Sequence, residues 1–305
     1  MKINRREFTK AGLGAATLAT LGTPAFAGPE HMIKGVIPKT GEKLPIIGLG
    51  TNRYGVGTSP EERAPLKAAL AKFHALGGTV IDTAPMYRTS ESVLGDLIAE
   101  LGIHDDLFIA TKADKKDGGD ATDAQMQESL RKLKTDSFDL MQVHNLIGWR
   151  AALPVMREWK DAGKIRYVGI TTSRSDQYGD FENVMREQEL DFIQINYSLG
   201  QREAADRILP LAADKGIAVI VNRAFYAGRL FKAVADQSLP EWVNDFGCDS
   251  WAQFFLKYAI GHPAATLSIP GMTKLRHVED NWRAGHGRLP NATERTRMEA
   301  FFDAL

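Results

Sequence analysis

Short apolar runs alternate with amphipathic segments along most of the chain. Eight of these runs are apolar at nearly every position, which is typical of parallel strands buried on both faces. They are residues 45–50, 79–82, 107–112, 138–144, 165–170, 192–196, 217–221 and 266–269. Helical periodicity fills residues 60–76, 90–102, 121–134, 149–162, 176–188, 201–215 and 249–261. Eight strands with intervening helices predict an α/β fold, a closed (β/α)8 TIM barrel in a single domain.

Residues 222–248 are the longest stretch without clear periodicity. They contain Gly228, Pro240 and Trp242, and we interpret them as a long functional loop rather than a domain boundary. A further helix is expected to begin at residues 271–274, after the last strand.

The first 27 residues have the order of a secretory signal. The pair Arg5-Arg6 precedes a weakly apolar stretch, and Ala25-Phe26-Ala27 places small residues where a signal peptidase cleaves. The paired arginines resemble a twin-arginine export signal. We therefore expect a twin-arginine signal peptide at 1–27 and the barrel at 28–305; a disordered or cytoplasmic arm is the alternative. This interpretation predicts a periplasmic protein exported folded by the twin-arginine machinery.

Composition narrows the possible functions. The 305 residues carry a formal net charge of zero, which provides no electrostatic footprint for nucleic acid, and no apolar run reaches the length of a membrane span. Cys248 is the only cysteine, so an intramolecular disulfide is impossible. Its neighbours Asp245 and Asp249 would raise the pKa of the thiol, which disfavours a catalytic cysteine. No His/Cys spacing of a metal site occurs, and we expect no metal.

Four polar residues follow apolar runs at consecutive strand ends. Asp82, Lys112 and His144 each close a strand, and Tyr87 lies five residues beyond Asp82. Strand ends of a barrel converge on the face where active sites are built. A lysine ammonium lowers the pKa of a nearby tyrosine, a carboxylate can hold that ammonium, and a histidine can donate to a carbonyl oxygen. The set predicts proton donation by Tyr87 to an oxygen that gains negative charge.

Several segments around these residues resemble the signature sequences of the aldo-keto reductase family. They are residues 81–87, 110–112, 141–145, 163–170, 193–197 and 268–271, and the resemblance extends over about residues 33–285. It implies the (β/α)8 barrel, the catalytic tetrad Asp82, Tyr87, Lys112 and His144, and a nicotinamide cofactor that gives hydride to a carbonyl carbon. NADPH is the donor implied, with NADH as the alternative, and the substrate is a small aldehyde or ketone.

The resemblance also implies cofactor contacts. These residues are Thr51, Asn52, Asp82, Thr171, Thr172, Gln194, Asn222, Arg223, Phe225, Gly228, Gly271, Thr273, Lys274, Asp280 and Asn281. Gln194 matches the residue that holds the nicotinamide carboxamide. Thr172 replaces the family's usual asparagine, and Asn222 replaces the tyrosine that many members stack on the nicotinamide. Arg223 is expected on the pyrophosphate, with a surface salt bridge as the alternative.

The segment after the last strand is expected to bind the adenosine 2′-phosphate. Lys274 and the amide groups of the helix that opens there suit this phosphate. His277 replaces a basic residue of some members, which leaves the choice between NADPH and NADH open. Tyr54, Asn145 and Trp149 are expected on the substrate side, with plain packing as the alternative.

Three function classes are compatible with a barrel of this kind. The first is an NADP-dependent carbonyl reductase, and the second is a cofactor-binding sensor or partner subunit with vestigial catalysis. The third is a hydrolase with paired carboxylates, which is disfavoured because Asp82 is the only carboxylate among these strand ends. The chain lacks the third glycine of a dinucleotide fingerprint after Gly48 and Gly50, which argues against a Rossmann fold.

Overall fold

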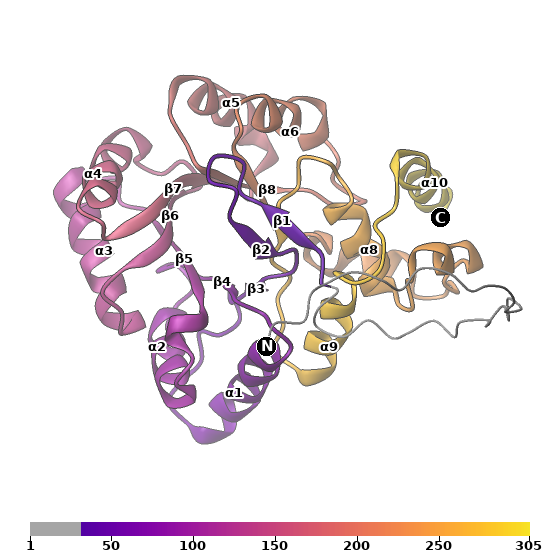
Figure 1. Ribbon diagram of the computed structural model, residues 1–305, viewed down its shortest axis with the longest axis horizontal. Helices are drawn as coiled ribbons and strands as arrows, with labels where there is room; N and C mark the ends of the chain where they lie inside the picture. The colour runs from indigo at the N-terminus through magenta and orange to yellow at the C-terminus, as the bar shows by residue number, and fades with distance from the viewer. Residues whose placement is uncertain (1–31) are drawn as a thin grey trace, which may run out of the picture.

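The computed structural model describes residues 32–305, so the predicted signal peptide lies outside the described residues. Eight parallel strands pair in chain order, β3 to β10, and confirm the predicted barrel (Figure 1). The strands are β3 (Leu49–Gly50), β4 (Val80–Asp82), β5 (Phe108–Ala113), β6 (Phe138–His144), β7 (Ile165–Thr171), β8 (Phe192–Asn196), β9 (Ala218–Asn222) and β10 (Leu267–Ser268).

Helices cover the outside of this sheet (Figure 1). They are α1 (Pro60–Ala75), α2 (Ser90–Leu101), α3 (Gly119–Leu133), α4 (Trp149–Asp161), α5 (Tyr178–Glu187), α6 (Ala204–Asp214), α7 (Arg229–Ala233), α8 (Trp251–Ile260), α9 (Leu275–Arg283) and α10 (Ala292–Asp303). Ser59 caps α1 as its sequence predicts, because its hydroxyl accepts from the Glu62 amide. The helix expected at 271–274 begins slightly later, with Lys274 as the residue before α9.

The barrel closes between its first and last strands. The amide of Gly48 donates to the Ser268 carbonyl at 2.8 Å, and the amide of Ser268 donates to the Ile46 carbonyl at 2.9 Å. The amide of Gly50 donates to the Pro270 carbonyl at 3.0 Å. These bonds bring the segment after β10 beside the segment after β3, where cofactor residues were predicted from both.

The strand expected at residues 45–50 is divided in the structure. Residues 43–45 form β2 (Lys43–Pro45), which pairs antiparallel with β1 (Lys34–Val36) instead of continuing into β3. The hairpin closes the amino-terminal end of the barrel, where Ile37 and Leu44 join the apolar layer inside it. Gly35 permits this close packing, because a Cβ atom there would lie 1.8 Å from the Thr266 carbonyl oxygen.

The long loop predicted at residues 222–248 contains short helices, which the sequence analysis missed. They are η4 (Tyr226–Gly228), α7, and η5 (Glu241–Phe246). Aromatic contacts hold this segment on α8: the ring of Phe231 lies 5.0 Å from that of Phe225 and 5.4 Å from that of Phe255. Helices this short have too few turns to produce a periodic pattern.

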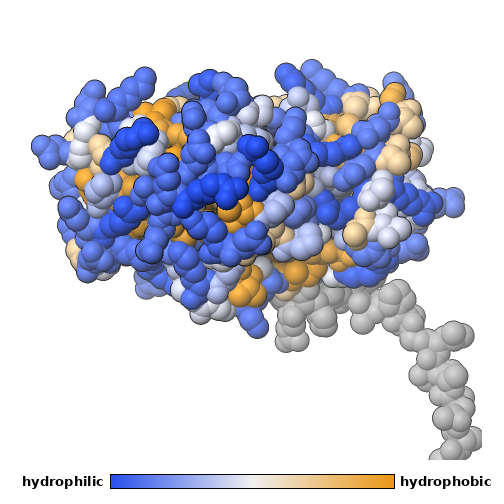
Figure 2. Space-filling model, turned by 90° about the horizontal axis from the view of Figure 1, so that it is seen from above, coloured by the Kyte–Doolittle hydropathy of each residue, from blue (hydrophilic) through white to orange (hydrophobic). Residues whose placement is uncertain are grey.

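The C-terminal helix α10 was also missed. It begins with a capping box, in which Asn291 and Glu294 bond each other's backbone amides, and it buries only Met298 fully. Figure 1 shows it outside the ring of barrel helices. Within residues 32–305, no helix is both long and apolar enough to cross a membrane. The face shown in Figure 2 is mostly hydrophilic, with small separated hydrophobic areas.

Candidate active site

Neighbouring strands bring the four predicted catalytic residues together. Asp82 is the last residue of β4, Lys112 is the penultimate residue of β5, and His144 is the last residue of β6. These strands pair in parallel, so the three side chains share the carboxyl-terminal end of the barrel. Tyr87 lies in the turn between β4 and α2, with its ring centroid 5.2 Å from Lys112 Nζ and 5.9 Å from that of His144.

Asp82 and Lys112 form a buried ion pair. Lys112 Nζ donates to Asp82 Oδ1 at 2.8 Å, to Oδ2 at 2.7 Å and to the Thr83 carbonyl at 2.7 Å. Burial alone would lower the pKa of Lys112, but the charge of Asp82 and the hydrogen bonds to its carboxylate outweigh burial, and the pKa is raised. Lys112 is therefore an ammonium ion, held in place by three acceptors.

Burial has the largest effect on the pKa of Tyr87, whereas the sequence predicted that the charge of Lys112 would dominate and lower it. Burial raises the pKa of the hydroxyl above its usual range, while the Lys112 charge acts in the opposite direction. Tyr87 therefore keeps its proton at neutral pH, as a proton donor must. After donation, the adjacent ammonium stabilises the phenolate that remains.

His144 is a neutral imidazole in this site. Burial, and then the charge of Lys112, lower its pKa to about 3. Its Nδ1 atom is fully buried and has no hydrogen-bond partner among the described residues. The carboxylate oxygen Oδ2 of Asp114, in the loop after β5, lies 4.0 Å from this nitrogen.

Two glutamines complete a polar layer beneath the ion pair, and one of them was missed from the sequence. Gln142 Nε2 donates to Asp82 Oδ1 at 3.4 Å and to Gln194 Oε1 at 3.2 Å, and Gln194 Nε2 donates to Asp82 Oδ2 at 3.4 Å. The signal for Gln142 was its polarity inside the apolar run 138–144, since a buried amide needs partners.

Predicted cofactor residues at the ends of β7 and β9 bond each other. Thr171 is buried beside Thr172, whose hydroxyl donates to Gln177 Oε1 at 2.6 Å. Asn222 Nδ2 donates to the Thr172 carbonyl at 3.3 Å, and Asn222 Oδ1 is buried without a partner. The Thr172 hydroxyl is thus already engaged, whereas the Asn222 oxygen has an unused lone pair.

The segment after β9 combines unusual backbone angles with exposed cations. Arg223, Tyr226 and Ala227 have φ angles of 52°, 48° and 54°, in the left-handed region that disfavours side chains. The Arg223 guanidinium donates to the Ser173 carbonyl at 3.0 Å, a backbone contact in place of the surface salt bridge that was the alternative; its contact with the pyrophosphate stays a prediction. Phe225 is half-buried, and Gly228 has a positive φ of 85°.

The remaining predicted cofactor residues lie beside the barrel closure. Thr51 is buried and its hydroxyl donates to the Asp82 carbonyl at 2.9 Å. Asn52 and Gly271 are exposed neighbours, with Asn52 Oδ1 3.7 Å from where a Gly271 Cβ would lie. Thr273 is half-buried, and Lys274 is exposed at the start of α9.

Asp280 and Asn281 lie in α9. The side chain of Asp280 accepts hydrogen bonds from α8 and from the residue before it, and the side chain of Asn281 is buried. Asp280 accepts hydrogen bonds from the Ser250 hydroxyl at 2.8 Å and from Gln253 Nε2 at 2.7 Å, which tie α9 to α8. Asn281 is buried. These hydrogen bonds hold the Asp280 carboxylate between α8 and α9, and its predicted contact with the cofactor stays a prediction.

The three expected substrate residues differ in exposure. Tyr54 is fully buried and its hydroxyl donates to the Met272 carbonyl at 3.0 Å, so its position corresponds to the packing alternative. Asn145 has a positive φ of 52°, and its Oδ1 accepts from the Ser173 amide at 2.9 Å. Trp149 is half-buried at the start of α4, with the Arg150 guanidinium 4.3 Å from its ring.

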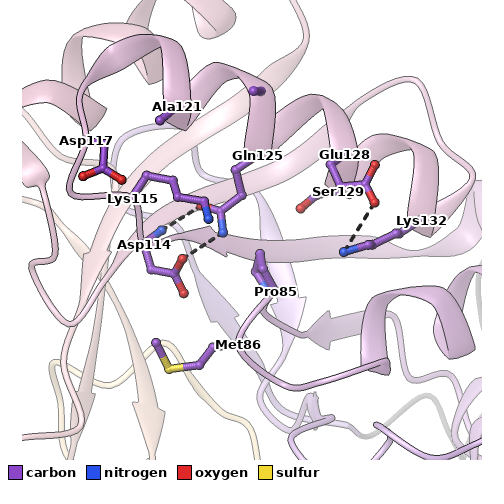
Figure 3. Close-up of a pocket in the computed structure, with 11 residues that line it drawn as sticks. Pro85, Met86, Asp114, Lys115, Asp117, Ala121, Gln125, Glu128, Ser129 and Lys132 are labelled. Carbon is purple, nitrogen blue, oxygen red and sulfur yellow. Dashed lines mark hydrogen bonds and ion pairs between the residues drawn. The ribbon is translucent and has the colours of Figure 1, made fainter.

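A cavity of about 630 Å³ lies next to the Tyr87 turn and the Asp114 loop (Figure 3). Its lining combines polar and apolar surface and comes from residues 85–86, 114–117 and α3. The lining residues are Pro85, Met86, Asp114, Lys115, Asp117, Ala121, Ala124, Gln125, Glu128, Ser129 and Lys132.

Neither a metal centre nor a reactive thiol is found in residues 32–305. No group of three or more His, Cys, Asp or Glu side chains is placed to hold a metal ion. Cys248 is buried, and burial raises the pKa of its thiol to about 12, as the sequence analysis expected in direction.

Comparison with known proteins gives one consistent family. Residues 46–294 match the model of the aldo/keto reductase family. The chain is 34% identical over 211 residues to the aldo-keto reductase YhdN of Bacillus subtilis, covering 64% of this chain and 62% of that protein. It is 27% identical to the methylglyoxal reductase YeaE of Escherichia coli, over 78% of this chain and 84% of that protein.

A solved structure has the same architecture. An aldo-keto reductase from Klebsiella pneumoniae in complex with NADPH superposes with a TM-score of 0.75 and 26% identity, covering 89% of this chain and 96% of that one. The two structures are therefore similar over nearly the whole barrel, and not only in the segments around Tyr87.

Proposed function

Because the chain belongs to the aldo/keto reductase family, we propose that it reduces an aldehyde or ketone to an alcohol with NADPH. The observation that carries this proposal is the buried Asp82–Lys112 pair beside a Tyr87 that retains its proton. NADPH, when bound, supplies the hydride that adds to the carbonyl carbon. Tyr87 donates its proton to the carbonyl oxygen, and Lys112, oriented by Asp82, stabilises the phenolate.

The nicotinamide half of the cofactor fits the ends of β8 and β9. Asn222 Oδ1 is a buried acceptor without a partner, and an amide N–H of the nicotinamide would satisfy it. Gln194 lies on the adjacent strand, and its carboxamide already orients Asp82. The Thr172 hydroxyl is held by Gln177, so among these groups the unpartnered Asn222 oxygen replaces it in this role.

The phosphate groups fit the exposed cations around α9. Lys274 and Arg276 are exposed at the first turn of this helix, where backbone amides also favour an anion. This cluster supports NADPH over NADH, because only NADPH carries the 2′-phosphate. A contact of Arg223 with the pyrophosphate requires its bond to the Ser173 carbonyl to be exchanged.

Turnover tests this function directly. Purified residues 28–305 are mixed with NADPH and a panel of aldehydes, and NADPH consumption is followed by absorbance. Methylglyoxal belongs in the panel because the Escherichia coli relative is named a methylglyoxal reductase. We expect turnover that Tyr87→Phe abolishes. Bound NADPH without turnover of any aldehyde, and with no difference between wild type and Tyr87→Phe, would favour the sensor alternative.

The N-terminal sequence supports a second proposal, on location. We infer that Arg5-Arg6 and the stretch to Ala27 direct export through the twin-arginine machinery, and that NADPH is loaded in the cytoplasm before the folded protein is exported. Replacing both arginines with lysine is expected to retain the protein in the cytoplasm when cells are fractionated. Equal export of both versions, or a mature periplasmic protein that binds NADPH only weakly, would contradict this proposal.

A further inference from the structure

Within residues 32–305, Met86 is the one methionine whose side chain is exposed. It is 53% exposed, the highest value among the large hydrophobic side chains of this part of the chain. The only cysteine, Cys248, is buried, and burial raises the pKa of its thiol to about 12. The other seven methionines are each at most 8% exposed: Met32, Met126, Met141, Met156, Met185, Met272 and Met298. An oxidant that arrives from solvent therefore meets one accessible sulfur atom in the described part of the chain.

This sulfur lies beside the catalytic residues. Met86 directly precedes Tyr87 in the turn between β4 and α2, and it lines the 630 Å³ cavity together with Asp114 (Figure 3). The Asp114 carboxylate lies 4.0 Å from the His144 ring, so this end of the cavity adjoins the catalytic residues. Met86 contributes apolar surface to a lining that also contains charged side chains.

The backbone of the turn is held independently of the Met86 side chain. The Tyr87 amide donates to the Ala84 carbonyl at 3.0 Å, and the Tyr87 carbonyl accepts from the Ser90 amide at 3.1 Å. Gly55 packs against this carbonyl, because a Cβ atom there would lie 2.3 Å from its oxygen. A chemical change at the end of the Met86 side chain therefore alters the surface of the cavity and leaves the backbone of Tyr87 in place.

We propose that Met86 is a modification site, at which a peroxide converts the thioether to a sulfoxide and thereby lowers the activity of the adjacent site. In this step the sulfur gives two electrons to hydrogen peroxide and bonds one of its oxygens. The O–O bond breaks, and the other oxygen leaves as water with both hydrogens. A methionine sulfoxide reductase reverses the step: two thiols become a disulfide, and the sulfoxide oxygen is released as water.

The sulfoxide replaces a flexible apolar side chain with a polar one. An aldehyde with a long apolar chain, bound with its oxygen at Tyr87, loses an apolar contact when its chain passes Met86. The loss should be larger for hexanal than for propanal, whose chain is short. This change in activity rests on the proposed reductase function, whereas the oxidation of Met86 follows from its exposure alone.

Mass spectrometry locates the modification without any turnover. The purified protein is treated with hydrogen peroxide, the peroxide is removed, and the peptides are analysed. We expect the Met86 peptide to gain the mass of one oxygen before any other methionine of residues 32–305, with Cys248 unmodified. Equal or faster oxidation of one of the seven buried methionines overturns the proposal.

Kinetics measure the consequence for activity. The kcat/KM for hexanal in treated wild type should fall about tenfold, the size expected when one apolar contact to a substrate is lost, and less for propanal. Methionine sulfoxide reductases acting on both epimers of the sulfoxide should restore the untreated value. Each variant is compared with its own untreated form: Met86→Leu should keep its value after treatment. Met126→Leu, which removes a buried methionine of α3, should lose as much as the wild type.

Two kinetic outcomes would overturn the proposal. One is an equal loss in treated Met86→Leu, and the other is a wild type that is fully oxidised at Met86 and keeps its activity with hexanal. A wild type that reduces no aldehyde before treatment contradicts the proposed function instead, and mass spectrometry then still decides whether Met86 is the oxidised residue.

Discussion

At the carboxyl-terminal end of the barrel, the ion pair on the proton-transfer side and the polar groups at the ends of β7 to β9, on the cofactor side, differ in how fully their hydrogen bonds are satisfied. At β4 to β6, Asp82 and Lys112 satisfy each other at 2.7 Å and are almost fully buried. At β7 to β9, Asn222 keeps an unpartnered oxygen, and the backbone of Arg223 is in the left-handed region. The ion pair is held by two neighbouring strands, whereas Thr172 and Arg223, two of the proposed cofactor residues, lie just beyond strand ends and are held by hydrogen bonds within the loops.

Removing the proton donor should have the largest effect. Tyr87→Phe is expected to lower kcat by about 10³-fold, because general acid catalysis contributes 10²- to 10⁴-fold. Affinity for NADPH, measured by cofactor fluorescence, should change little. Tyr167→Phe is the matched control, since its hydroxyl bonds Glu42 at the opposite end of the barrel. A small loss in Tyr87→Phe, comparable to that of the control, would assign the proton to another group.

Breaking the Asp82–Lys112 ion pair tests how much this pair contributes to the stability of the fold. Lys112→Met should destabilise the fold by about 3–5 kcal/mol, because it leaves the Asp82 carboxylate buried without its charge partner. Combining it with Asp82→Asn should restore much of the loss. Denaturant unfolding of the single and double variants measures both. If the double variant were as unstable as the sum of the two single ones, the pair would not act as a unit.

Substitutions on the cofactor side should change the KM for NADPH rather than kcat. Lys274→Gln and Arg276→Gln are each expected to raise the KM for NADPH about tenfold, as a charge-assisted bond to the 2′-phosphate is lost. The KM for NADH and the kcat with either cofactor should stay near the wild-type values. Parallel kinetics with both cofactors make this comparison. An equal rise for NADH would place these cations on a part of the nucleotide that both cofactors share.

The same difference explains what the sequence could predict. Asp82, Lys112 and His144 end apolar strands, and parallel pairing converts that pattern directly into a shared location. The polarity of Gln142 inside an apolar run signals a buried amide, but its partners Asp82 and Gln194 lie 60 and 52 residues away and cannot be read from that run. The sequence also did not predict that Tyr54 turns inward to the Met272 carbonyl, since that contact joins loops 218 residues apart.

Acid should lower the stability of the fold gradually, and two histidines, His144 and His262, should contribute to this loss. Burial lowers the pKa of His144 to about 3 and that of His262, in the turn before β10, to about 4. Unfolding returns each to its ordinary pKa near 6.5, so the unfolded chain binds more protons below that pH. The stability contributed by the neutral rings is therefore present above about pH 6.5. It is lost as the pH falls toward 4 for His262 and toward 3 for His144.

Substituting each histidine separates its contribution to acid stability from that of the other. These contributions are the smallest effects that we expect. His262 Nδ1 accepts from the Ala264 amide at 3.2 Å, and an asparagine oxygen can accept the same bond without titrating. In His262→Asn, the thermal midpoint should fall less steeply between pH 6.5 and 4, with the activity at neutral pH retained. His144→Asn should flatten the same range and lower activity as well. A slope unchanged in both variants would mean that carboxylates alone set the acid limit, and that neither buried ring gains a proton on unfolding.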